Sequence, residues 1–126
     1  GEMPCFKVYE DEHTLAFLDI MPRADGHTLI IPKAPSRTLL DAEREALHDA
    51  IVTCQKIAQA AQKAFNADGI LLQQSSESAA GQVIFHLHFH IMPRWDGVDL
   101  RPPGQKADDA VLEEHAQRIR DALAAL

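Results

Sequence analysis

The segment 85–91, Phe85-His86-Leu87-His88-Phe89-His90-Ile91, alternates an apolar side chain with a histidine at every step. Side chains of a β-strand point to opposite faces in turn, so the pattern predicts a strand over residues 83–92. We expect the apolar row to pack under a helix, which places the three imidazoles together on the opposite, polar face.

Three of the seven histidines therefore occupy consecutive positions on one strand face, about 6–7 Å apart. One interpretation is a solvated face that happens to use histidine. A second is a metal site with His27 as a further ligand, although the outer two histidines would lie roughly 13 Å apart, too far to share one ion. The interpretation we favour is nucleophilic catalysis. A neutral imidazole can attack phosphorus, and its neighbours can donate to phosphoryl oxygens.

Composition narrows the class of protein further. The 126 residues suffice for one domain, and 46% of them are hydrophobic. The net charge of −7 and the lack of a Lys/Arg cluster argue against long nucleic acids but allow a phosphorylated small molecule. No apolar run is long enough to cross a membrane. Cys5 and Cys54 have no CxxC partner, which favours reduced thiols in the cytoplasm over a disulfide scaffold.

The remaining pattern predicts an α+β fold, an antiparallel sheet of about five strands with one long helix and a C-terminal helix. The other strands are expected at residues 7–10, 14–20, 27–31 and 70–74, with Asp25-Gly26 as a turn. Asp41 is expected to cap the long helix, which should end near Asn66. The tail from Asp108 has a helical period.

These motifs together resemble the histidine-triad (HIT) family of nucleotide hydrolases and transferases. Its signature alternates three histidines with apolar residues and ends in two apolar residues, and residues 86–92 match it throughout. Residues 15–32 resemble a second family block, and Ala80-Gly81-Gln82 resembles the loop that meets the phosphates. The resemblance implies a single HIT-like domain over residues 1–126, usually assembled as a homodimer.

The resemblance also implies roles for individual residues. His88 matches the nucleophile that becomes nucleotidylated, and His90 the residue that contacts phosphate and helps the leaving group. His86 and His27 match supporting histidines. The residues expected to bind substrate are Asp19 at the ribose, Phe17 and Ile20 near the base, and Ser75, Gly81, Gln82 and Val83 around the phosphates and leaving group.

Some positions depart from the family pattern. Ser75 stands where relatives often have Asn or Gln, and Val83 where many have Ser or Thr, which affects the expected substrate preference. Met92-Pro93-Arg94 follows the triad instead of a Gly-Gly pair, as in the bacterial and dinucleotide-hydrolase-like branches. The resemblance further implies a short segment before Gly1 in a complete product, where a zinc-binding cysteine pair can occur.

We therefore expect a hydrolase of nucleotides with a leaving group on the α-phosphate, of the purine nucleoside phosphoramidate type, acting through a nucleotidyl-histidine. No metal is required for this chemistry, although magnesium can accompany a polyphosphate substrate. Three alternatives remain open. They are a dinucleoside polyphosphate hydrolase, a non-catalytic nucleotide-binding dimer, and a zinc protein built on His27, His86 and His88.

Overall fold

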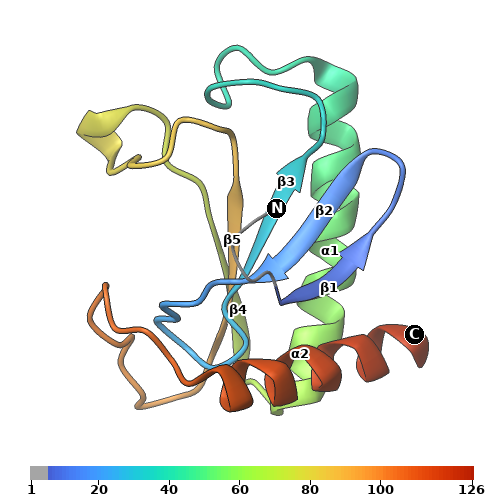
Figure 1. Cartoon of the computed structure of the whole chain (residues 1–126), viewed down its shortest axis with the longest axis vertical. Helices are drawn as coiled ribbons and strands as arrows, with labels where there is room; N and C mark the ends of the chain where they lie inside the picture. Colours follow the sequence, from blue (N-terminus) through green and yellow to red (C-terminus); the bar gives the residue numbers. More distant parts are fainter. Residues whose placement is uncertain (1–5) are drawn as a thin grey trace.

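The computed structural model describes residues 6–126, which form a five-stranded antiparallel sheet and two helices (Figure 1). The strands are β1 (Lys7–Glu10), β2 (Thr14–Leu18), β3 (Thr28–Pro32), β4 (Gly69–Gln73) and β5 (Phe89–Arg94), and the helices are α1 (Arg44–Phe65) and α2 (Asp109–Ala124). The order across the sheet is β1-β2-β3-β5-β4, which leaves β1 and β4 at the edges. The α+β architecture predicted from the sequence is confirmed.

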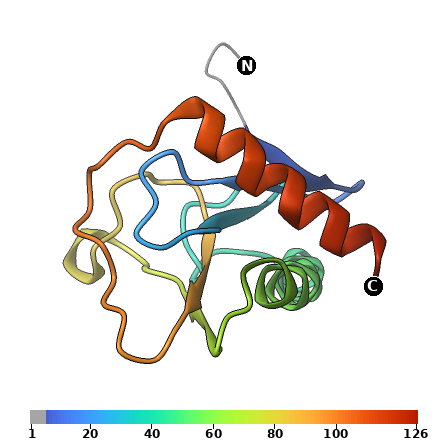
Figure 2. The same ribbon diagram turned by 90° about the horizontal axis from the view of Figure 1, so that it is seen from below.

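The helices lie on one side of the sheet. In Figure 2, α1 is seen nearly end-on and α2 runs obliquely beside it, while the long loops on either side of β5 lie away from the two helices. Neither helix is long and apolar enough to span a bilayer, a statement that covers residues 6–126.

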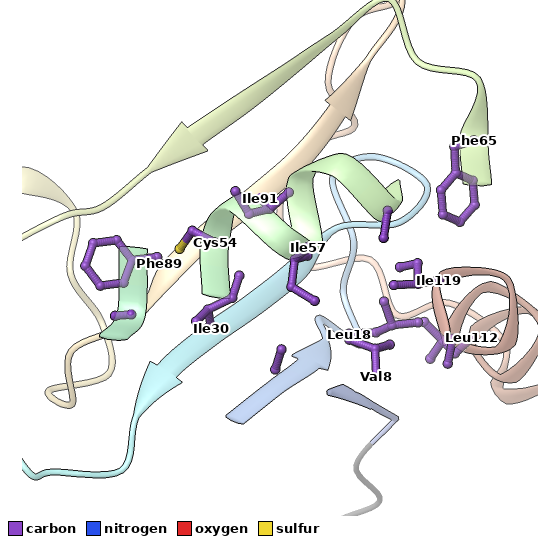
Figure 3. Close-up of a cluster of buried hydrophobic side chains, with 14 of the residues drawn as sticks. Val8, Leu18, Ile30, Cys54, Ile57, Phe65, Phe89, Ile91, Leu112 and Ile119 are labelled. Atoms are coloured by element: carbon purple, nitrogen blue, oxygen red, sulfur yellow. The ribbon is translucent and has the colours of Figure 1, made fainter. Parts of the chain in front are cut away.

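The apolar stripe of α1 packs on the central strands. Ile57 and Cys54 of α1 share a buried cluster with Ile30 of β3 and Ile91 of β5 (Figure 3). Each such large aliphatic side chain stabilises the fold by about 1.5–3 kcal/mol. Leu87, which is also buried in this cluster, belongs to the apolar row that the sequence places under the helix.

The strand of the histidine motif is shorter than predicted. Regular pairing with β3 begins only at Phe89, whereas residues 83–88 are irregular, and the amide of Leu87 donates to the carbonyl of Ser36. The predicted packing of Phe85 in the core is wrong. Its side chain is 42% exposed, and the Arg37 guanidinium lies 4.2 Å from the ring centroid. The alternation of buried and half-buried positions nevertheless holds from His86 to Ile91.

Turns and caps fix the ends of the other elements. The predicted strand 14–20 ends at Leu18, because the Asp19 carboxylate accepts the Met21 amide in a turn. The prediction that Asp41 caps α1 is wrong. The helix begins at Arg44, and the Asp41 carboxylate instead accepts the amides of residues 37 and 38. The end of α1 at Asn66 is as predicted, and Asn66 adopts the left-handed conformation.

Candidate active site

The site is built where β5 and β3 begin, on the face of the sheet away from α1. His90 lies in β5 opposite Leu29 of β3 and Gln73 of β4. The ring centroid of His90 is 5.0 Å from that of His88 and 5.1 Å from that of His27. Three of the four predicted histidines therefore converge. His86 lies beside them and approaches the Pro32 carbonyl with Nε2 at 3.3 Å.

The backbone determines which nitrogen of His88 can react. Its Nδ1 lies 2.8 Å from the carbonyl oxygen of His86. A carbonyl only accepts hydrogen bonds, so Nδ1 carries the proton and the Nε2 lone pair is free in the neutral ring. This is the tautomer that a nucleophile requires.

A second backbone group fixes the tautomers of His27 and His90. The amide of Arg23 donates to Nδ1 of His27 at 3.1 Å, which places the proton of neutral His27 on Nε2. That Nε2 lies 2.9 Å from Nδ1 of His90 and donates to it. Neutral His90 must then carry its own proton on Nε2, so it presents an N–H donor beside the lone pair of His88.

Burial keeps this pair of rings neutral near pH 7. Burial lowers the pKa of His27 to about 4, opposed by the Asp19 carboxylate, and burial together with His88 lowers the pKa of His90. The Asp19 carboxylate lies 3.7 Å from His27 Nε2. The carboxylate therefore sits where it can stabilise positive charge that develops on these imidazoles.

Of the other predicted nucleoside residues, Phe17 lies on the same face as this group, whereas Ile20 packs against the hydrophobic core. Phe17 is half-buried on β2, opposite Leu29, which itself lies opposite His90, so Phe17 shares the histidine face of the sheet. Ile20 is half-buried, and its carbonyl accepts the amide of Ala107. Asp19, Phe17 and His90 thus occupy one continuous surface.

The predicted phosphate loop has a different internal arrangement from the one expected. Gln82 was predicted to reach toward the phosphates, but its side chain is buried. Oε1 accepts the Glu77 amide at 2.6 Å, and Nε2 donates to the carbonyls of Arg37 and Ile84. The amides of Gly81 and Gln82 already donate to carbonyls of Ser78 and Glu77. Gln82 therefore holds the loop in shape.

The remaining loop residues flank this framework. Ser75 is half-buried, and Gly81 adopts a φ of 103°, a conformation that glycine tolerates best. Val83 is 83% exposed and offers no hydroxyl.

Within residues 6–126, the side chains whose metal-ligating atoms all lie within 4.8 Å of one another are those of Asp19, His27 and His90. They are not the set of His27, His86 and His88 considered as an alternative from the sequence. Ligation by His27 Nε2 would move its proton to Nδ1, where the Arg23 amide already donates. The observed hydrogen bonds fit a pair of linked imidazoles better than a metal centre. The sequence does not show that the Arg23 amide contacts His27. The grouping of Asp19, His27 and His90 was therefore not predicted.

Comparison with known proteins agrees with this geometry. The sequence model of the HIT domain matches residues 1–97. A HIT-like protein involved in cell-cycle regulation from Bartonella henselae is 52% identical, with a TM-score of 0.92 over 96% of this chain and 88% of that one. A hypothetical histidine triad nucleotide-binding protein of Sulfolobus tokodaii is 34% identical, with a TM-score of 0.92 over 99% of this chain and 87% of that one. The adenylylsulfatase HINT3 of Arabidopsis thaliana is 40% identical over 86% of this chain and 58% of that protein.

Proposed function

Because the chain belongs to the histidine-triad (HIT) family, we propose that it hydrolyses nucleotides carrying a leaving group on the α-phosphate, through a nucleotidyl intermediate on His88. The observation that carries this proposal is the pair of complementary tautomers, a lone pair on His88 Nε2 beside an N–H on His90 Nε2.

In the first step, His88 Nε2 attacks the α-phosphorus, the bond to the leaving group breaks, and the leaving group departs with the bonding electrons and takes up one proton from solvent. The positive charge that grows on the imidazole is stabilised by the hydrogen bond from Nδ1 to the His86 carbonyl. His90 donates its Nε2 proton as a hydrogen bond to an oxygen of the phosphoryl group. In the second step, water attacks phosphorus and releases one proton to solvent, the P–N bond breaks, and its electrons return to Nε2.

We assign the nucleoside to the adjoining surface. Asp19 has one carboxylate oxygen engaged by the Met21 amide, and the other, 3.7 Å from His27, remains able to accept a ribose hydroxyl. Phe17 and Ile20 supply apolar area for a purine. An adenosine phosphoramidate is the first substrate to test. The adenylylsulfatase among the relatives supports an α-phosphate reaction in a broader sense.

Two other activities remain alternatives. A dinucleoside polyphosphate would use the same attack by His88 on a longer substrate, with magnesium balancing the extra phosphates. A non-catalytic nucleotide-binding dimer would use the pocket without turnover.

We further propose that the molecule works as a homodimer joined through β4. This edge strand and α1 frame an apolar groove of about 410 Å³, and the groove is lined by the exposed side chains Ile51, Val52 and Leu72. A second copy that pairs β4 with β4 would extend the sheet and cover the groove. We also propose the cytoplasm as the compartment, because Cys54 is a free, buried thiol; Cys5 lies outside the described residues.

Replacement of His88 by alanine tests the proposed function. We expect His88→Ala to bind AMP with an affinity within a few-fold of that of the native chain. Its kcat should fall by about 10³-fold or more. The exposed His13 provides the matched control, since His13→Ala should keep full turnover. A screen of adenosine phosphoramidate, diadenosine triphosphate and diadenosine tetraphosphate then ranks the substrates. Turnover retained by His88→Ala would overturn the proposal.

A further inference from the structure

A second cavity lies outside the site of His88, between the β2–β3 turn and the segment that follows β5. It has a volume of about 160 Å³. Three arginines reach it from separate segments, Arg23 from the turn, Arg94 from the end of β5 and Arg101 from the loop beyond. Trp95 also lines the cavity, and its indole N–H donates to the carbonyl of Phe65 at 3.0 Å. Such a gathering of cations is notable in a chain whose net charge is −7.

Hydrogen bonds hold these segments in place. The amide of Arg101 donates to the carbonyl of Arg23 at 2.8 Å, and Nε of Arg23 donates to the carbonyl of Arg101 at 2.9 Å. The Arg94 guanidinium donates to the carbonyl of Val98 at 2.7 Å. The guanidinium groups are therefore oriented before any ligand arrives, which lowers the entropic cost of binding.

The charges of the cavity do not balance. Arg101 is paired with Asp25, but within residues 6–126 neither Arg23 nor Arg94 has a carboxylate at ion-pair distance. A guanidinium has five N–H donors, and the structure uses one on each of these two side chains, so most of their donors remain available. Asp99 also lines the cavity, and its carboxylate would repel an anion there.

We propose that this cavity is a binding site for a small, multiply charged oxyanion of the phosphate class. Planar guanidinium groups suit such anions because they donate two parallel hydrogen bonds to neighbouring oxygens. The volume of about 160 Å³ accepts a phosphate or a pyrophosphate but falls below the 300 Å³ or more usual for pockets that enclose larger ligands. The site does not depend on the proposed hydrolase activity.

The position of the cavity links it to the catalytic group. Arg23, whose guanidinium lines the cavity, is also the residue whose amide fixes the tautomer of His27. An anion held by the Arg23 side chain would therefore bind the same residue that contacts His27 through its backbone.

The chain carries its own reporter for this site, because Trp95 is its one tryptophan and lines the cavity. The full chain is titrated with inorganic phosphate at pH 8 and constant ionic strength, with chloride as the balancing anion, while tryptophan emission is recorded. We expect a saturable change with phosphate and none with chloride or acetate. The double variant His88→Ala/His90→Ala should keep the response, which separates this cavity from the active site.

Charge variants decide the assignment. Arg94→Gln should weaken phosphate binding by roughly tenfold. Asp99→Asn, which removes a repelling carboxylate and breaks none of the hydrogen bonds within residues 6–126, should tighten it by a few-fold. The matched control is Arg44→Gln, an exposed arginine on α1, which should leave the curve unchanged.

Circular dichroism establishes that each variant is folded. Should Arg94→Gln fail to fold, Asp99→Asn alone still tests the site. An emission change that does not saturate, or an affinity that neither Arg94→Gln nor Asp99→Asn alters, would overturn the proposal.

Discussion

At His88 the carbonyl of His86 accepts a hydrogen bond from Nδ1–H, whereas at His27 the amide of Arg23 donates a hydrogen bond to Nδ1. These two backbone contacts give neighbouring imidazoles opposite properties. His88 offers a lone pair at Nε2, and His90 offers a proton there. The chemistry of the site thus depends on backbone groups as much as on the choice of histidine at each position.

The burial of His27 makes the stability of the fold depend on pH. His27 is 3% exposed, and its pKa falls from 6.5 to about 4 on folding. Between these values the unfolded chain binds more protons, so stability is full above pH 6.5 and is lost as pH falls toward 4. We expect the free energy of unfolding to fall by about 2 kcal/mol from pH 7.5 to pH 5 because of His27. The lowered pKa of His90 adds to this loss.

Urea unfolding of the native chain and of His27→Gln at both pH values measures this contribution. The variant should lose less stability on acidification, while the exposed His13→Gln should follow the native chain. An equal loss in His27→Gln and the native chain would show that His27 is not the titrating group.

At the scale of the secondary-structure elements, the turn between β2 and β3 carries His27, and its shape depends on Gly26, the residue before it. Gly26 has a φ of 81°, and a Cβ there would lie 2.6 Å from the Phe65 ring. Gly26→Ala should therefore destabilise the fold by about 2–3 kcal/mol, from left-handed strain and a clash with a buried ring. Gly69→Ala on β4 is the control, since no atom lies within 4 Å of its added Cβ. Thermal unfolding compares the two, and similar melting temperatures would contradict this account of the turn.

The loop before β5 depends on Gln82 in the same way. Gln82→Ala leaves the Glu77 amide and two carbonyls without their partner, which should cost about 2 kcal/mol locally. We expect faster hydrogen exchange at the amides of Gly81 and Gln82, whereas Val83→Ala, at an 83% exposed position, should leave exchange unchanged. If Gln82 instead contacts substrate directly, its loss will raise KM without altering exchange.

The sequence predicted most of these elements because their patterns are local. The alternation from His86 to Ile91 and the long helix α1 each arise from neighbouring residues, and both are confirmed, although Ile51 of the predicted apolar stripe is exposed. What it could not predict depends on distant backbone groups. The Leu87 amide bonds to Ser36, and Gln82 bonds to Arg37, 45 residues away. These contacts replace strand pairing over residues 83–88 and turn Gln82 inward.

For the molecule as a whole, the exposed β4 edge and its apolar groove are the features that predict assembly. Leu72 is 44% exposed on β4, and Leu72→Asp would place a charge in the proposed dimer interface. We expect light scattering to give the mass of a dimer for the native chain and of a monomer for this variant. Leu40→Asp, at an 80% exposed position outside the groove, should remain dimeric. A monomeric native chain would contradict the proposed assembly.

Rapid quenching of the enzyme with substrate tests the central claim most directly. The native chain is mixed with adenosine phosphoramidate, and the reaction is stopped within the first turnover. The sample is kept at mildly alkaline pH, where a P–N bond survives, digested, and analysed by tandem mass spectrometry. We predict an added AMP group on His88, and none on His86 or His90. Attack by His88 Nε2 would be contradicted if the AMP group were attached to another residue. Turnover with no modified peptide at any quench time would contradict it as well.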